Sequence, residues 1–191
     1  MPTVMIMGGG WGVFSKEEKE RLVTYVSNWR DSIQFLFCLG TNEKAKQQLL
    51  EDKTFQHPNI HLIGYTNEIS KIMDVSDLLI TKPGGMTCTE AMAKGIPMLF
   101  FNAIPGQEEE NWHYFEEQGY GQMITSPEMV NHWFRLLLEQ YPSMVQRRYN
   151  IRNRLQFQDQ DSVQAIMQYL KLSANRTYIE ESTQAPLIQW Y

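Results

Sequence analysis

A repeated unit constrains the fold of this chain more than any other feature. The apolar run TVMIM (3–7) ends in glycines and precedes the helical pattern SKEEKERLVTYV, and similar units begin with IQFLFCLG, NIHLIGY, DLLITKPGG, IPMLFF and GQMIT. Short buried strands that alternate with helices form a parallel sheet with helices on both faces. The sequence therefore predicts an α/β fold, a Rossmann-like doubly wound parallel sheet, with further helices after Pro142.

Polar residues mark where several of these helices are predicted to begin. Ser15 and Glu18 have the spacing of a capping box, and Ser126 precedes another helical pattern. Thr87 is predicted to cap the helix that follows two adjacent glycines, which places Glu90 on the first turn of that helix. Each helix is therefore expected to start shortly after a strand ends.

Composition and charge exclude several classes of protein. The chain is 42% hydrophobic and 20% charged, as in ordinary globular proteins, and its net charge of -5 argues against a general nucleic-acid binder, which needs a basic face. Cys38 and Cys88 belong to no ligand cluster, so we expect buried free thiols. Without a long apolar run or a signal-peptide pattern, the sequence predicts a cytoplasmic protein, at most attached to a membrane surface.

Two glycine-rich loops follow predicted strands, at 8–12 and at 84–85. Ligands of doubly wound sheets bind beyond the carboxyl ends of the strands, where glycines let backbone amides approach a phosphate. A nucleotide cleft is the predicted function of these loops, although the first loop is also compatible with turn glycines alone. A nicotinamide oxidoreductase is disfavoured, because GGGWGV has Val13 where the dinucleotide fingerprint needs a small residue, and no P-loop motif occurs.

Glu90 and Lys82 are the charged candidates around the second glycine loop. Glu90 can accept hydrogen bonds from a ribose diol, or it can bond the backbone as the capping-box partner of Thr87. Lys82 can offset the charge of a diphosphate, or it can be a solvated lysine at the end of a strand. No DxD-like pair occurs in the loops, so no metal site is predicted.

The stretch DLLITKPGGMTCTEAMAKGIPMLFF, followed by PGQEEEN, resembles the C-terminal, nucleotide-sugar-binding half of the GT-B glycosyltransferases of family 28. Within that family, the sequence is most similar to monogalactosyldiacylglycerol synthases and to the processive diacylglycerol glucosyltransferases of Gram-positive bacteria. The resemblance extends from the first strand to about Phe157. It implies one half of a GT-B fold, with a nucleotide-sugar-binding domain at 1–172 and a C-terminal tail at 173–191 that packs on a missing N-terminal domain.

The resemblance also implies a site for a UDP-sugar, which is the donor substrate, with no cofactor. In it, Glu90 holds the uridine ribose, the segment around Tyr65 receives the uracil, and the glycine loops lie against the diphosphate. Gln107 and Glu108 read the sugar hydroxyls. Lys82 is added to the residues that the resemblance implies, because of its charge. The predicted donor-binding residues are then Gly9, Gly10, Trp11, Gly12, Tyr65, Thr66, Lys82, Gly84, Gly85, Met86, Thr87, Glu90, Gln107, Glu108 and Asn111.

Family members take their catalytic base mainly from the N-terminal domain, so the resemblance implies no catalytic residue in this chain and little or no activity for the chain alone. The implied reaction of the intact enzyme is an inverting transfer of glucose or galactose from UDP to a lipid acceptor such as diacylglycerol, at the inner face of the cell membrane. The implied partners are the UDP-sugar, the lipid, and an N-terminal acceptor domain in cis or as a separate subunit.

Three alternatives remain open at the level of sequence. The chain can be the donor-binding subunit of a split transferase that uses UDP-N-acetylglucosamine, or a non-catalytic module that binds nucleotide sugars. A UDP-N-acetylglucosamine 2-epimerase shares the fold and the donor site, but its acidic catalytic residues are not recognisable in this sequence.

Overall fold

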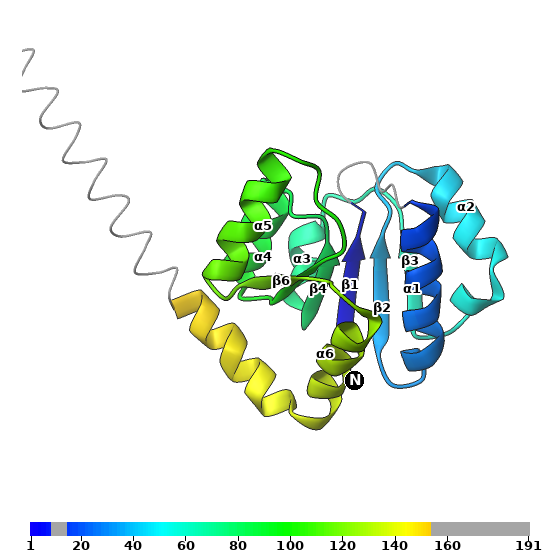
Figure 1. The fold of residues 1–191 in the computed structure, drawn as a ribbon. Coiled ribbons are helices and arrows are strands. Elements are labelled where there is room, and N and C mark those ends of the chain that lie inside the picture. Colours follow the sequence, from blue (N-terminus) through cyan, green and yellow to red (C-terminus); the bar gives the residue numbers. More distant parts are fainter. Residues whose placement is uncertain (9–14, 154–191) are drawn as a thin grey trace, which may run out of the picture. The chain divides into compact units, whose positions relative to one another are not determined.

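The computed structural model describes residues 1–8 and 15–153, and Figure 1 shows how this part of the chain is arranged. Its six strands form one parallel sheet. The strands are β1 (Thr3–Met7), β2 (Gln34–Cys38), β3 (Ile60–Ile63), β4 (Leu78–Thr81), β5 (Met98–Phe100) and β6 (Gly121–Met123). The predicted doubly wound α/β fold is confirmed.

The order of the strands in the sheet is β3-β2-β1-β4-β5-β6. From β1 the chain adds β2 and then β3 on one side. It then places β4 on the other side of β1 and continues outward with β5 and β6. The two central strands are therefore neighbours in space, with Val4 beside Leu78 and Met7 beside Thr81. In such sheets, the connections from these two strands lead away to opposite faces and open a crevice between them.

Helices cover both faces of the sheet (Figure 1). They are α1 (Lys16–Trp29), α2 (Glu43–Glu51), the 3₁₀ helix η1 (Lys53–Phe55), α3 (Ile69–Asp74), α4 (Gly85–Lys94), α5 (Gln107–Glu117) and α6 (Pro127–Glu139), followed by helical residues 141–153. Helices α1 and α6 pack together on one face, and α3 and α4 pack together on the other. The first compact unit of the chain is Met1–Arg152. The predicted boundary at 172 and the tail at 173–191 lie outside the described residues.

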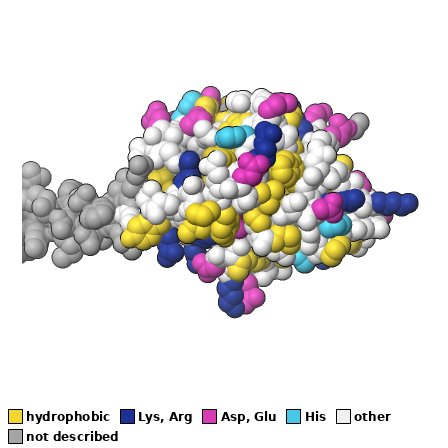
Figure 2. Space-filling view, turned by 90° about the horizontal axis from the view of Figure 1, so that it is seen from below, with side chains coloured by type: hydrophobic (Ala, Val, Ile, Leu, Met, Phe, Trp, Pro, Cys, Tyr) yellow, Lys and Arg dark blue, Asp and Glu magenta, His cyan; other side chains and the backbone are white. Residues whose placement is uncertain are grey.

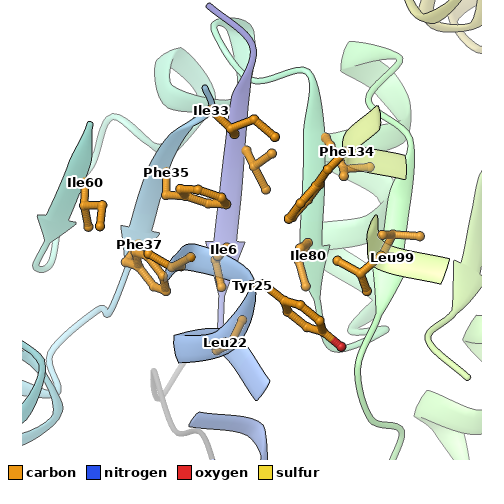
Figure 3. Packing of buried hydrophobic residues seen from close by; sticks show 14 of the residues in the cluster. Ile6, Leu22, Tyr25, Ile33, Phe35, Phe37, Ile60, Ile80, Leu99 and Phe134 are labelled. Atoms are coloured by element: carbon orange, nitrogen blue, oxygen red, sulfur yellow. The ribbon is translucent and has the colours of Figure 1, made fainter. Parts of the chain in front are cut away.

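Phe134 of α6 is the centre of the core between the sheet and helices α1 and α6 (Figure 3). Its ring makes edge contacts with Tyr25, Trp29 and Phe35 at centroid distances of 6.5, 5.8 and 5.8 Å. Each such pair contributes about 1 kcal/mol beyond the burial of apolar surface. This packing fixes α1 against the sheet, and it thereby positions the start of α1 at the carboxyl edge.

The predicted capping box at the start of α1 is confirmed. The amide of Glu18 donates to Ser15 Oγ at 3.1 Å, and the amide of Ser15 donates to Glu18 Oε2 at 2.6 Å. Ser126 caps α6 as predicted, since its hydroxyl accepts from the amide of Met129. Both helix starts therefore follow from local sequence.

The predicted cap of α4 is wrong. Helix α4 begins at Gly85 with Gly84 as its N-cap, so Thr87 lies inside the first turn and caps nothing. The reason is a tight turn, in which the amide of Gly84 donates to the carbonyl of Lys82 at 2.8 Å, and the Gly84 carbonyl already accepts the first helical bond from Cys88. Glu90 consequently lies on the second turn of α4 and not on the first.

Asp77 closes the amino-terminal edge of the sheet. The residue is 6% exposed, and its carboxylate accepts hydrogen bonds from the amide of Thr3 at 2.9 Å, from the hydroxyl of Tyr141 at 2.9 Å and from Arg148 at 3.4 Å. These bonds tie helical residues 141–153 to the starts of β1 and β4. Figure 2 views the molecule from this side and shows hydrophobic side chains among charged ones on the surface.

Both cysteines are buried free thiols, as predicted. Burial raises the pKa of Cys38 to about 11 and, together with the nearby charge of Glu108, that of Cys88 to about 12. Both side chains therefore pack as neutral apolar groups.

No helix in the described residues combines the length and the apolar character that crossing a bilayer requires.

Candidate functional site

The carboxyl edge of β1 and β4 is the topological switch point of the sheet. The two glycine-rich loops of the sequence leave the sheet at this point, one after Met7 and the other after Thr81. The fold therefore brings the second loop to the start of the first, although they are far apart in the sequence. The predicted donor residues Gly9, Gly10, Trp11 and Gly12 lie outside the described residues.

Gly84 and Gly85 leave open space in front of α4. The backbone of Gly84 has φ -74 and ψ 131, which any residue adopts, and no described atom lies within 4 Å of the position that a Cβ would take. A Cβ on Gly85 would meet only Asn111 Nδ2, at an ordinary contact distance of 3.7 Å. Neither glycine is therefore required by the described backbone or by its packing.

The start of α4 also carries unpaired backbone donors. No side chain caps this end, and the first helical hydrogen bond runs from the amide of Cys88 to the carbonyl of Gly84. The amides of Gly85, Met86 and Thr87 precede that bond, and no described carbonyl accepts from them. Helix amides in this position attract anions, because the helix dipole adds to their partial positive charge.

The side chain of Glu90 makes no hydrogen bond or ion pair within the part of the chain that the structure describes. Its side chain is exposed, on the second turn of α4. The capping-box alternative for Glu90 is overturned, because the N-cap is Gly84, which has no side chain for a reciprocal bond. The carboxylate is therefore free to accept hydrogen bonds from a ligand near the start of α4.

The residues predicted for the uracil and the diphosphate present exposed groups near the same edge. Tyr65 follows β3 and is 72% exposed, while the neighbouring Thr66 hydroxyl accepts from the amide of Glu68 at 3.0 Å. Met86 is 82% exposed at the start of α4. Lys82 is partly exposed, and its carbonyl accepts the turn bond from Gly84.

The three residues predicted to lie near the sugar differ in what they contact. Gln107 is exposed at the first position of α5, directly after Gly106, whose φ of +101 a residue with a side chain rarely adopts. Glu108 Oε2 accepts from the amide of Ile104 at 2.9 Å, and Asn111 Nδ2 donates to the carbonyl of Pro83 at 2.9 Å. Gln107 is therefore available to a ligand, whereas Glu108 and Asn111 brace the loops on either side.

One connection in this region is invisible to sequence reasoning. The sequence pattern identifies Glu18 only as a capping residue, but its second oxygen accepts from Asn102 Nδ2 at 3.2 Å. The two residues are 84 positions apart, so no local pattern signals the contact.

Within residues 1–8 and 15–153, no three His, Cys, Asp or Glu side chains gather closely enough to hold a metal ion. Lys82 precedes α4 in the chain, and the amides at the start of this helix carry partial positive charge. The sequence-based prediction of a site without metal stays a prediction.

Residues 3–170 match the model of the Glycosyltransferase family 28 C-terminal domain. The chain belongs to glycosyltransferase family 28. A processive diacylglycerol beta-glucosyltransferase of Staphylococcus saprophyticus is 38% identical over 128 residues, which are 66% of this chain and 32% of that protein. A Staphylococcus aureus protein with the same name is 36% identical over 126 residues. The family 28 chain thus spans about a third of the length of these relatives.

Solved structures confirm that the fold is one half of a GT-B glycosyltransferase. WaaG, a glycosyltransferase of lipopolysaccharide biosynthesis, aligns with a TM-score of 0.60 at 21% identity, over 80% of this chain and 42% of WaaG. At this level of identity, the likeness concerns the fold of this family 28 chain alone.

Proposed function

We propose that this family 28 chain binds a UDP-sugar at the carboxyl edge of β1 and β4, as the donor half of a hexosyltransferase. The observation that carries the proposal is the pair Gly84 and Gly85, which the described fold does not require and which leaves open space at the start of α4. A diphosphate fits this space, because three backbone amides and the positive end of the helix dipole face it. Lys82 supplies a further positive charge.

The other parts of the donor follow from the positions of the remaining exposed residues. Glu90 accepts the ribose hydroxyls, and the backbone of Tyr65 and Thr66 receives the uracil. Gln107 meets the sugar hydroxyls at the start of α5, with Glu108 beside it. Glu90 is unpaired within the described residues and Gln107 is exposed, which supports these roles.

The proposed reaction of the intact enzyme is an inverting transfer. A base from the N-terminal domain removes the proton of an acceptor hydroxyl, the hydroxyl oxygen attacks the anomeric carbon, and UDP leaves. The amides at the start of α4 stabilise the negative charge that develops on the departing diphosphate. The relatives named diacylglycerol beta-glucosyltransferases support glucose as the sugar and diacylglycerol as the acceptor. Such an acceptor places the enzyme at the inner surface of the cell membrane.

Calorimetric titration of the 191-residue chain tests the donor site. UDP, UDP-glucose, UDP-galactose and UDP-N-acetylglucosamine are titrated in parallel with NADH. We expect the UDP compounds to bind and Glu90→Ala to weaken them by roughly 1–3 kcal/mol, because a charged hydrogen-bond acceptor is lost. Glu117→Ala is the matched control, since it removes the same charge from an exposed position at the far end of α5.

Two results would contradict the proposal. Preferential binding of NADH would favour an oxidoreductase, and equal effects of the two glutamate variants would remove Glu90 from the site. Transfer assays after addition of the N-terminal half of a relative distinguish an enzyme from a non-catalytic module. The ranking among the UDP-sugars distinguishes a glucose or galactose donor from the UDP-N-acetylglucosamine of the split-subunit alternative.

A further inference from the structure

Glu18 joins two loops at the carboxyl edge of the sheet. Its Oε2 accepts from the amide of Ser15, the N-cap of α1, at 2.6 Å. Its Oε1 accepts from Asn102 Nδ2 at 3.2 Å, in the β5–α5 loop (residues 101–106). A capping box needs only the first of these bonds. The second bond therefore serves something other than the start of α1.

The β5–α5 loop is held by side chains at both of its ends. Asn102 is bound by Glu18 from α1, and the amide of Ile104 is bound by Glu108 from α5. Gln107 follows this loop directly and begins α5. The position of Gln107 relative to the switch point therefore depends on where the loop is fixed.

Glu18 is the buried partner of this pair. It is 9% exposed and lines a small cavity of about 20 Å³ together with Arg21, Tyr25, Ile80 and Phe101, whereas Asn102 is exposed. A buried carboxylate that is left without hydrogen-bond partners is costly. Glu18 consequently favours one position of Asn102 over others.

We infer that Glu18 is a positioning residue for the sugar part of the donor. By holding Asn102, it keeps the β5–α5 loop and Gln107 in the arrangement that the bound sugar needs. A loop that is already ordered loses less entropy when it binds a ligand. Loss of the bond therefore weakens binding of a UDP-hexose but leaves binding of UDP itself, which lies at α4, unchanged. This inference rests on the proposed donor site.

Exchange of the two hydrogen-bonding groups provides the test. Asn102→Asp places two carboxylates against each other, whereas Glu18→Gln keeps both hydrogen bonds once the exposed Asn102 amide turns its oxygen toward the new side-chain nitrogen. The double variant, which combines both substitutions, restores the pair. In the double variant, the amide oxygen at position 18 accepts from the Ser15 amide, and the amide nitrogen at position 18 donates to the carboxylate at position 102. The net charge of the double variant equals that of the unchanged protein. Glu17→Gln is the matched control, since Glu17 is exposed one residue earlier on the same turn.

The variants of the 191-residue chain are titrated with UDP, UDP-glucose and UDP-galactose. Amide hydrogen exchange of residues 101–106 is measured without ligand. We expect Asn102→Asp to weaken the UDP-hexose about fivefold, in keeping with one net hydrogen bond, and UDP less than about twofold. Exchange in the loop becomes faster in Asn102→Asp. Glu18→Gln, the double variant and Glu17→Gln resemble the unchanged protein in both measurements.

Several outcomes would overturn the inference. Equal weakening of UDP and the UDP-hexoses would indicate a general structural role, and unchanged exchange in the loop would show that the bond does not hold it. Asn102 is exposed, so Asn102→Ala, which removes the donor without adding charge, retains the test if the double variant fails to fold. If the unchanged protein binds no UDP compound, the proposed function fails, and hydrogen exchange alone decides whether Glu18 positions the loop.

Discussion

The two ends of helix α4 are both glycines, but for opposite reasons. Gly95 at the C-cap has φ +72, and a Cβ there would lie 2.4 Å from the carbonyl oxygen of Arg148. Gly84 at the N-cap has φ -74, and no described atom lies within 4 Å of its Cβ position. The fold requires glycine at one end only. The glycine that the fold does not require lies at the proposed donor site.

The same contrast separates two acidic residues. Asp77, at the amino edge, is buried and accepts three hydrogen bonds from within the chain. Glu90, on α4, is exposed and has no partner in the described residues. One edge of the sheet is thus completed by the chain itself, whereas the other leaves groups available to a ligand.

Gly95→Ala is expected to have the largest effect of the following variants. It lowers the free energy of unfolding by about 3 kcal/mol, because a Cβ at positive φ costs roughly 1–2 kcal/mol and the clash with helical residues 141–153 costs roughly 1–3 kcal/mol. Urea unfolding measures this loss. A loss below about 1 kcal/mol would show that the helix moves away easily, and it would weaken the contrast with Gly84.

Asp77→Ala is expected to lower the free energy of unfolding by about 2 kcal/mol, since it leaves the buried amide of Thr3 without an acceptor. Asp74→Ala is the control, because Asp74 is exposed and its ion pair with the partly exposed Lys94 contributes about 0.5 kcal/mol. Chemical denaturation of both variants checks the difference. Similar losses would mean that burial of Asp77 adds nothing.

Gly84→Ala is expected to lower ligand affinity and to leave stability nearly unchanged, in contrast to Gly95→Ala, which lowers stability. Stability changes by less than about 0.5 kcal/mol, because the backbone conformation suits alanine and the space is open. Affinity for UDP falls about tenfold, or about 1.4 kcal/mol, because the methyl group occupies space proposed for the diphosphate. Calorimetry and thermal unfolding of one preparation give both numbers, and unchanged UDP affinity would place the diphosphate elsewhere.

Gln107→Ala sharpens the contrast within the proposed site. The affinity for the preferred UDP-hexose falls by about 1 kcal/mol, the net value of one hydrogen bond, while that for UDP is unchanged. Competition titrations with the two ligands measure the difference. An equal loss for UDP would move Gln107 from the sugar to the nucleotide.

Alkaline pH is expected to have the smallest effect near neutrality. Burial raises the pKa of Cys38 to about 11 and of Cys88 to about 12, above the ordinary value of 9.0. The unfolded chain therefore loses these protons first, and the free energy of unfolding falls as the pH rises above about 9. Burial also raises the pKa of Tyr25 and Tyr141 and acts in the same direction. Urea unfolding at several pH values tests this, and Cys88→Ala reduces the slope.

Patterns within a few residues predicted much of the structure. The alternation of apolar runs with helices indicated the parallel sheet, and the spacing of Ser15 and Glu18 indicated a capping box, because both depend on local backbone chemistry. Local reasoning was wrong at Thr87, where the turn formed by Lys82 and Gly84 starts the helix earlier. The Thr87 hydroxyl would suit an N-cap, but the backbone turn between Lys82 and Gly84 starts the helix at Gly85 instead.

The sequence by itself determined the fold class, the family resemblance and the residue types available for a donor site, since these follow from periodicity and from motifs that are contiguous in the chain. Only the tertiary structure decided which of those residues are free. It bound Asn111 to Pro83 and Glu108 to Ile104, and it joined Glu18 to Asn102 across 84 positions. Side-chain hydrogen bonds depend on distances between separate elements, and packing sets those distances only when the whole sheet and its helices assemble.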